Sequence, residues 1–297
     1  TPVRVDRHVL EADLRILTGR ITHHYFAGFS GGRKSILPGI SARATILANH
    51  RRVLDPDSPG QVHSQVFGGN LVGNPVHEDM VQAARMVGPV WILNTLLDRR
   101  HRITHAFAGE LEEAHLAGCR EAERLFFFPD PEPVPVVVAS AGGFPFDLNL
   151  IQGLKALFNH REAVAPGGVF ILVAESAGGF LTGMKQWLCW TDKATLGPAM
   201  AASYNLAAHN CLMLRQILEA VTVILVSALP GEEVEALGLL PASSLSEALA
   251  MARGKLGRRS ELRVIHDGNV TQSGRRRGRI GHAAGVADRV QVARRAS

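Results

Sequence analysis

Apolar and polar positions follow two different periods along the chain, and the changes of period mark the expected strands and helices. Residues 90–98, VWILNTLLD, are apolar almost throughout and predict a buried strand. Residues 74–88 instead repeat their apolar positions at helical spacing, with Asn74 placed to cap a helix and Pro75 suited to its first turn. Residues 110–126 predict a second amphipathic helix.

Strand and helix signals continue to alternate in the second half of the chain, after a proline-rich stretch that predicts a linker. Such alternation is typical of mostly parallel sheets covered by helices on both faces. We therefore expect an α/β protein with two domains of this kind. The predicted parts are an N-terminal domain at residues 1–128, a linker at 129–135 and a C-terminal α/β domain at 136–271.

Composition and charge narrow the class of protein. Of all residues, 46% are hydrophobic and 20% charged, and no apolar run approaches the roughly 20 residues that span a bilayer. The net charge of +5 is uneven: residues 253–297 hold 12 Lys and Arg against 3 Asp and Glu, and residues 1–252 hold 20 against 24. The basic stretch lacks interleaved aromatic residues, so we expect residues 272–297 to form a disordered, solvated tail rather than a nucleic-acid-binding arm. Three widely spaced cysteines indicate no disulfide framework, as in cytoplasmic proteins.

The candidate chemistry is concentrated in residues 21–51, ITHHYFAGFSGGRKSILPGISARATILANHR. This segment holds two adjacent histidines, His23 and His24, a glycine-rich turn with Lys34, and a third histidine, His50. Glycines let backbone N–H groups approach a phosphate or a ring. A lysine offers a charge or an amine nucleophile, and imidazoles move protons or bind a metal.

Two common nucleotide motifs are excluded by spacing. A P-loop requires the lysine directly after the last glycine, whereas Arg33 separates Gly32 from Lys34. The Gly-x-Gly-x-x-Gly pattern of dinucleotide-binding folds is absent as well, together with the acidic residue that would contact the ribose.

Three motifs together resemble the nickel-dependent lactate racemase family: HYFAGFSGGRKSILPGI, the ANHR that follows it, and NPVHEDM at residues 74–80. The resemblance extends from about Val5 to about Thr271. It implies that Lys34 is joined covalently to a nickel-pincer nucleotide, pyridinium-3-thioamide-5-thiocarboxylic acid mononucleotide, and that His50 is the protein ligand to nickel. It also implies an active site in the cleft between the two domains.

Further site residues follow from the same resemblance. His24 matches a histidine that acts as catalytic acid and base, and QGLK at residues 152–155 matches a pair that contacts the substrate, here Gln152 and Lys155. Their spacing of three residues would place both side chains on one face of a helix. The family has a further N-terminal segment with a second catalytic histidine and a substrate-binding arginine, so we expect this chain to begin inside the first domain.

The implied reaction is racemisation or epimerisation of a 2-hydroxy acid, lactate or a related acid, through a keto acid. Removing the C2 hydrogen as hydride requires a cofactor, because no side chain accepts hydride. One imidazole can complete the plane of a square-planar nickel complex. The implied partners are the small-molecule acid and the enzymes that make the cofactor, with no membrane or nucleic-acid partner.

Other interpretations stay open. The chain could be an inactive fragment or a non-catalytic binding protein that retains the racemase fold. A generic zinc hydrolase using His23, His24 and His50 is disfavoured, because no carboxylate base stands at a recognisable spacing. His77, in the NPVHEDM motif, is as consistent with a structural role as with a role facing the cofactor.

Overall fold

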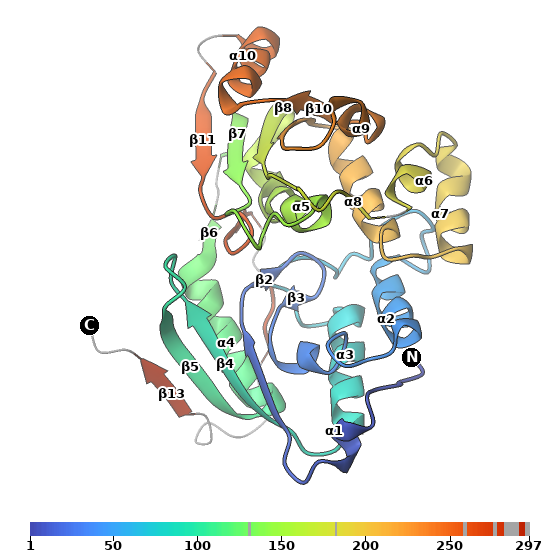
Figure 1. Ribbon diagram of the computed structural model, residues 1–297, viewed down its shortest axis with the longest axis vertical. Helices are drawn as coiled ribbons and strands as arrows, with labels where there is room; N and C mark the ends of the chain where they lie inside the picture. The colour runs from blue at the N-terminus through green and yellow to red at the C-terminus, as the bar shows by residue number, and fades with distance from the viewer. Residues whose placement is uncertain (130–131, 182, 258–259, 276–277, 282–290, 295–297) are drawn as a thin grey trace. The chain divides into compact units, whose positions relative to one another are not determined.

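The computed structural model of the 297-residue chain describes residues 1–129, 132–181, 183–257, 260–275, 278–281 and 291–294. The chain forms two compact units, drawn in Figure 1. Unit 1 comprises residues 1–53, 63–127 and 277–297, and unit 2 comprises residues 54–62 and 128–276. No helix in the described part of the chain has both the length and the apolar character needed to cross a membrane.

Unit 1 is built on a mixed four-stranded sheet in the order β1-β4-β5-β13. Its elements are α1 (His8–Glu11), β1 (Ile16–Arg20), β2 (His23–His24), β3 (Gly28–Phe29), η1 (Gly32–Ser35), α2 (Arg43–His50), η2 (Arg51–Val53), α3 (Pro75–Met86), β4 (Trp91–Leu97), β5 (Ile103–Glu110), α4 (Leu111–Phe126) and β13 (Gln291–Arg294). Only β1 and β4 run parallel. This differs from the mostly parallel sheet expected here, because a turn at residues 98–102 joins β4 to β5, and so short a connection joins antiparallel neighbours.

Strand β4 is buried on one face only. Ile92 is buried against Leu111 and Ala114 of α4, whereas Trp91 and Leu93 are 54% and 43% exposed. The expectation of a buried strand therefore holds for every second residue, as the side-chain alternation of a strand with one covered face requires.

Unit 2 contains a five-stranded sheet in the order β10-β9-β8-β7-β11, and all of its pairings are parallel, as expected. Its elements are β7 (Val134–Ser140), α5 (Leu150–His160), η3 (Arg161–Ala163), β8 (Val164–Val173), α6 (Met184–Leu188), α7 (Lys193–Ala202), α8 (Ala208–Leu218), β9 (Thr222–Val226), α9 (Gly231–Ala236), β10 (Leu240–Ala242), α10 (Leu245–Leu256), β11 (Leu262–Ile265) and β12 (Gln272–Gly274), with β6 (Phe127–Pro129) at the boundary. Ala248 and Ala252 of α10 pack on one face of the sheet, and α5 covers the other (Figure 1).

The unit boundaries differ from the predicted domains in one further place. Residues 54–62 were expected in the first domain but belong to unit 2. A side chain at Gly197 would place its Cβ 2.2 Å from the backbone nitrogen of Gly60, so the two backbones lie in close contact. The expected linker at 129–135 begins one residue after the longer stretch of unit 2, which starts at Phe128, and its residues 130–131 lie outside the described residues.

The C-terminal segment returns to unit 1, although a disordered tail was expected for residues 272–297. The backbone N–H groups of Leu71 and Val72 donate to the carbonyl of Arg279, whose own N–H donates to Oδ1 of Asn70. Strand β13 then pairs with β5. Most of these contacts join backbone groups, which every residue has. The basic composition of the segment could therefore not predict them. Residues 276–277, 282–290 and 295–297 of the predicted tail lie outside the described residues.

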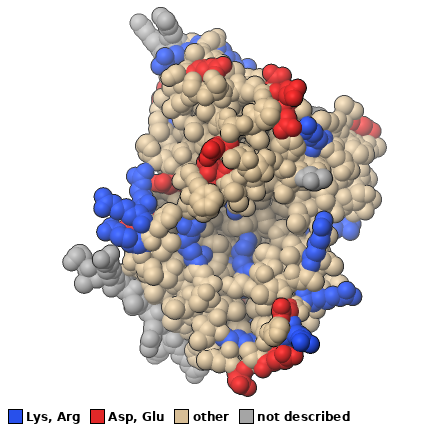
Figure 2. Space-filling model, in the orientation of Figure 1, with Lys and Arg blue, Asp and Glu red and all other residues tan. Residues whose placement is uncertain are grey.

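Charged side chains are dispersed over the face of the molecule drawn in Figure 2. On this face, some basic side chains of the described residues stand beside acidic ones, and others stand alone on a mostly uncharged surface. Arg102 pairs with Asp98, and Arg124 pairs with Glu121. In these two pairs the charges are therefore balanced locally.

Candidate functional site

The two adjacent histidines lie on opposite faces of a short hairpin, in which His23 is opposite Phe29 and His24 is opposite Gly28. His23 is buried, and its Nε2 lies 2.7 Å from Oε2 of Glu123 on α4. Its ring packs 4.9 Å from that of Phe29. His23 therefore ties the hairpin to the interior of unit 1, and it does not share a face with His24.

His24 is half-buried within an aromatic cluster. Its ring stacks on Tyr25 at 5.1 Å and meets the ring of Phe26 edge-on at 4.5 Å. The backbone N–H of Ala27 donates to Nδ1 of His24 over a long 3.3 Å. While this bond is formed, the neutral ring carries its proton on Nε2. Accepting a proton at Nε2 thus requires the other tautomer and the loss of the bond from Ala27.

The ring of Phe26 connects three of the five predicted site residues, Lys34, His50 and His24. Nζ of Lys34 lies 5.5 Å from the ring centroid, the distance of a cation–π contact. The rings of His50 and His24 lie 5.0 Å and 4.5 Å from it. Lys34 projects from η1, His50 is the last residue of α2, and the hairpin carries Phe26 and His24. Three separate elements of unit 1 therefore bring an amine and two imidazoles to one aromatic side chain.

His50 is neutral at physiological pH. It is 9% exposed, and burial, followed by the charge of Lys34, lowers its pKa to about 4. A neutral imidazole is the form that binds a metal ion. The donor chemistry of this pair therefore fits a group that is joined to an amine and coordinated by one imidazole.

The glycines of the turn pack against protein rather than leaving room for a phosphate. Gly28, Gly31 and Gly32 all have positive φ. A Cβ at Gly28 would lie 2.4 Å from the carbonyl oxygen of Asn70, and the N–H of Gly32 donates to Oδ1 of Asn94 at 2.7 Å. The prediction that these backbone groups approach a ligand is thus replaced, for Gly32, by an internal contact.

The buried side chain of Arg33 stabilises the turn from the interior of unit 1. Arg33 is 1% exposed, and its guanidinium donates to the carbonyl of Ala27 at 2.7 Å and contacts Nε2 of His115 at 3.0 Å. It forms no ion pair with a carboxylate among the described residues. Burial lowers its pKa to about 10, so it stays charged. The ring of His77 lies 6.5 Å from that of His115, and burial lowers its pKa too. His77 thus faces this buried cluster.

Helix α3 begins as its sequence predicts. Oδ1 of Asn74 accepts from the N–H groups of Val76 and His77, and Pro75 fills the first turn. The other end of the same amide adds a contact that the sequence did not show: Nδ2 of Asn74 donates to the carbonyl of Phe26 at 2.9 Å. The cap therefore also fixes the backbone that carries the central ring.

Gln152 and Lys155 lie on α5 of unit 2, as predicted. Nζ of Lys155 donates to Oε1 of Gln152 at 2.5 Å, so the two side chains do share one helical face. The helix is capped by Asn149, whose Oδ1 accepts from the N–H of Gln152, and Asn269 donates to the carbonyl of Gln152. The pair places an ammonium group next to an amide, and both groups can donate hydrogen bonds to a carboxylate.

No group of three or more His, Cys, Asp or Glu side chains in the described residues could hold a metal ion. With His23 engaged by Glu123, the three-histidine zinc interpretation gains no support. Sequence reasoning missed Phe26, Arg33 and Asn94 as parts of the site. Phe26 and Arg33 were signalled only by their place inside the motif, and Asn94, in the strand at residues 90–98, was not signalled at all, since these contacts join residues far apart in the chain.

Comparisons with known proteins cover most of the chain. A model of the lactate racemase N-terminal domain matches residues 1–60, and a model of the lactate racemase C-terminal domain matches residues 130–271. The chain belongs to the lactate racemase family. Lactate racemase of Thermoanaerobacterium thermosaccharolyticum is 35% identical over 277 residues, which cover 90% of this chain. Lactate racemase of Lactiplantibacillus plantarum is 33% identical over 273 residues, or 89% of this chain. This lactate racemase family member spans 62% of the length of each of these two curated relatives.

Solved structures agree with the family assignment. The apoprotein structure of lactate racemase from Thermoanaerobacterium thermosaccharolyticum matches with a TM-score of 0.81 at 33% identity, covering 92% of this chain and 65% of that one. A protein from Thermotoga maritima matches with a TM-score of 0.66 at 16% identity, covering 92% of this chain and 69% of that one, which shows a shared fold. The α/β fold predicted from sequence is therefore the fold of the lactate racemase family.

Proposed function

We propose that this member of the lactate racemase family takes part in racemising or epimerising a 2-hydroxy acid, lactate or a close relative. The observation that carries the proposal is the placement of Lys34, His50 and His24 around the ring of Phe26. Together these side chains offer an attachment point, a metal ligand and a proton carrier within one cluster of unit 1.

Lys34 and His50 are the residues that would hold a nickel-pincer nucleotide. The amine of Lys34 would carry the organic part, and the neutral imidazole of His50 would supply the protein ligand to nickel. When bound, this cofactor would supply a hydride acceptor for the hydrogen on C2 of the acid. The pKa of His50, lowered to about 4, keeps its ring unprotonated and able to coordinate at neutral pH.

His24 would move the proton of the substrate hydroxyl. In the tautomer that the bond from Ala27 favours, Nε2 holds a proton. Substrate binding would therefore have to shift the proton to Nδ1 before Nε2 could act as a base. The Ala27 bond is long enough, at 3.3 Å, for this shift to cost little.

Lys155 and Gln152 would bind the carboxylate of the acid. The ammonium of Lys155 already points to an amide oxygen, Oε1 of Gln152, at 2.5 Å. A carboxylate is a stronger acceptor than an amide for such a donor, so it would replace that contact. The charge of Lys155 serves both enantiomers equally, because it does not depend on the configuration at C2.

The test is to produce the chain together with the enzymes that make the cofactor and to measure its intact mass and its activity. We expect a covalent adduct of the pincer nucleotide on the chain. We expect interconversion of D- and L-lactate, followed by chiral chromatography, when the chain is extended by the N-terminal segment that carries the family's second catalytic histidine. An adduct without turnover of any 2-hydroxy acid would favour a non-catalytic binding protein, and a chain without an adduct would overturn the proposal.

A further inference from the structure

We propose that Asp79, on helix α3, is a positioning residue for His50. Asp79 belongs to the NPVHEDM motif, and the functions assigned above leave it without a role. The inference rests on the proposed function, because it concerns the residue that would hold nickel. Asp79 itself does not touch the imidazole of His50 in any contact described; it acts through the residues on either side.

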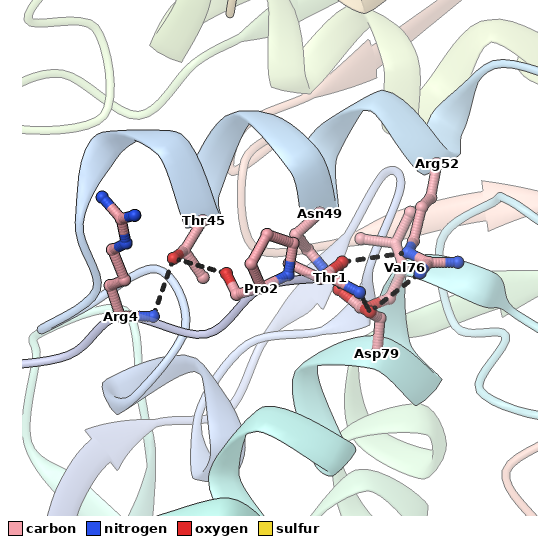
Figure 3. Close-up of polar contacts among 8 residues, drawn as sticks. All are labelled: Thr1, Pro2, Arg4, Thr45, Asn49, Arg52, Val76 and Asp79. Carbon is pink, nitrogen blue, oxygen red and sulfur yellow. Dashed lines mark hydrogen bonds and ion pairs between the residues drawn. The ribbon is translucent and has the colours of Figure 1, made fainter.

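The carboxylate of Asp79 is the centre of a buried polar network, shown in Figure 3. Asp79 is 6% exposed. Its Oδ2 accepts from Nδ2 of Asn49 at 2.8 Å and from Oγ1 of Thr1 at 2.9 Å, and its Oδ1 pairs with Nη2 of Arg52 at 3.1 Å. Asn49 directly precedes His50 and Arg52 follows it by two residues. One carboxylate therefore binds side chains on both sides of His50 in the sequence.

Of the contacts that Asp79 makes with Asn49 and Arg52, the bond from Asn49 restricts the position of helix α2 more. Nδ2 of Asn49 donates to Asp79 and also to the carbonyl of Val76 at 3.1 Å. Both partners are acceptors, so the amide can face them only with its NH₂ group. Asn49 is fully buried. Its side chain thus fixes the rotation of the last turn of α2 about the helix axis, and this rotation decides where the ring of His50 points.

Helix α2 depends on such contacts because its apolar side chains Ile46 and Leu47 are only half-buried. Its buried residues are Thr45, Asn49 and His50, and all three are polar. Thr45 is held in the same way, since its hydroxyl donates to the carbonyl of Pro2 and accepts from the N–H of Arg4, both at 3.0 Å (Figure 3). A helix placed by hydrogen bonds shifts when a bond is removed, whereas one placed by apolar packing resists a single change.

Helix α3 also contacts the other half of the candidate site. Nδ2 of Asn74, at its N-terminus, donates to the carbonyl of Phe26, whose ring contacts Lys34 and His50. Asn74 and Asp79 therefore lie on one short helix and hold the backbone of Phe26 and the end of α2, respectively. We infer that these two contacts of α3 together set the distance between the amine of Lys34 and the imidazole of His50.

The test follows nickel release from the cofactor-loaded chain into excess EDTA, with the metal content and the intact mass measured on the same samples. Partners of a metal ligand typically contribute about 10–100-fold to metal affinity. Asp79 acts through the neighbours of the ligand rather than on the ligand itself, so we expect Asp79→Leu to release nickel about 10-fold faster than the wild type, at the lower end of this range, while the organic adduct stays on Lys34. Asp79→Asn, which keeps an oxygen for Asn49 and loses the charge opposite Arg52, should lie closer to the wild type.

Arg85→Gln is the matched control. Arg85 lies on the same helix and pairs with Glu112 of α4, so its loss weakens α3 without touching α2. It should release nickel at the wild-type rate. A second measurement needs no cofactor: the ring resonances of His50 in the chain with labelled histidine should move in Asp79→Leu and stay in place in Arg85→Gln.

The outcomes separate this inference from the proposed function. A wild-type chain that binds neither adduct nor nickel contradicts the proposed function, and the resonances of His50 then decide about Asp79 alone. Wild-type nickel release and unchanged His50 resonances in a folded Asp79→Leu would overturn the positioning role. Should Asp79→Leu not fold, Asn49→Ala removes the same bond from the other side, and the same two results decide.

Discussion

Nη1 of Arg33 lies 3.0 Å from Nε2 of His115, and both side chains are buried beneath the turn that carries Lys34. The same nitrogen of His115 lies 2.9 Å from the carbonyl oxygen of Ser30. A neutral imidazole nitrogen either accepts or donates, so it can serve Arg33 or Ser30 but not both at once. Either way the ring stays neutral, because a proton on it would add a second buried cation beside Arg33.

This pair predicts a loss of stability in acid. Burial, followed by the charge of Arg33, lowers the pKa of His115 to about 3, below the ordinary value of 6.5. Between these two pH values the unfolded chain binds a proton that the folded chain does not, so the free energy of unfolding falls as the pH is lowered through this window. Above pH 6.5 the contribution is complete. We expect His115 to account for roughly 3–5 kcal/mol of this fall.

Urea unfolding at a series of pH values measures the effect. His115→Gln keeps a hydrogen-bonding side chain beside Arg33 but cannot titrate, so its stability should depend less steeply on pH than that of the wild type. Part of the dependence should persist, since burial lowers the pKa of His50 and His77 as well. Identical pH profiles for the variant and the wild type would contradict the assignment.

A second prediction concerns the attachment site. Lys34→Arg keeps the positive charge over the ring of Phe26 but removes the primary amine that could be acylated. We expect the intact mass of the variant to show no adduct under conditions that load the wild type. Lys185→Arg, at a lysine that pairs with Glu233, is the control and should load normally. Equal adducts on Lys34→Arg and the wild type would place the attachment elsewhere.

A third prediction concerns nickel. His50→Ala should lose most of its nickel and keep the organic adduct on Lys34, because the imidazole is proposed as the protein ligand and not as the point of attachment. Elemental analysis of the loaded protein, paired with intact mass, separates the two quantities. Unchanged nickel stoichiometry would mean that another side chain coordinates the metal.

A fourth prediction compares two glycines. Gly28 has φ of 74°, and a Cβ there would lie 2.4 Å from the carbonyl oxygen of Asn70, so Gly28→Ala should destabilise the chain by at least about 2 kcal/mol. Gly254 lies inside α10 with nothing near its missing Cβ, and Gly254→Ala should stabilise by about 0.5–1 kcal/mol. Urea denaturation of both variants tests the contrast, and a tolerated Gly28→Ala would show that the turn is not closely packed.

Local patterns predicted the features that depend on neighbouring residues. Asn74 and Pro75 marked the start of α3 correctly, because a cap acts within one turn of helix. The three-residue spacing of Gln152 and Lys155 likewise placed both side chains on one face of α5. The motif around Lys34 led to the family through its order of residues, without any knowledge of their contacts.

Long-range contacts could not be predicted in the same way. Arg33 looked like an interruption of a P-loop, and its use as a buried clamp depends on His115, which lies 82 positions further along the chain. The exposure of Trp91 depends on which face of β4 is covered by α4. The return of the C-terminal segment rests on backbone hydrogen bonds from Leu71 and Val72 to Arg279, which leave no trace in composition.

That return has a consequence for the order in which the chain is made. Strand β5 pairs on its outer side with β13, and loop residues near Asn70 pair with Arg279, so unit 1 receives its last partners only when residues 278–294 leave the ribosome. Residues 128–276 of unit 2 lie between these two parts of unit 1 in the sequence, and the five strands of the main sheet of unit 2 are all synthesised before then. During translation the outer edge of β5 therefore stays open to wrong pairing while unit 2 completes its sheet. A nascent chain stalled before residue 278 should expose this edge to chaperones, and synthesis of β13 should close it.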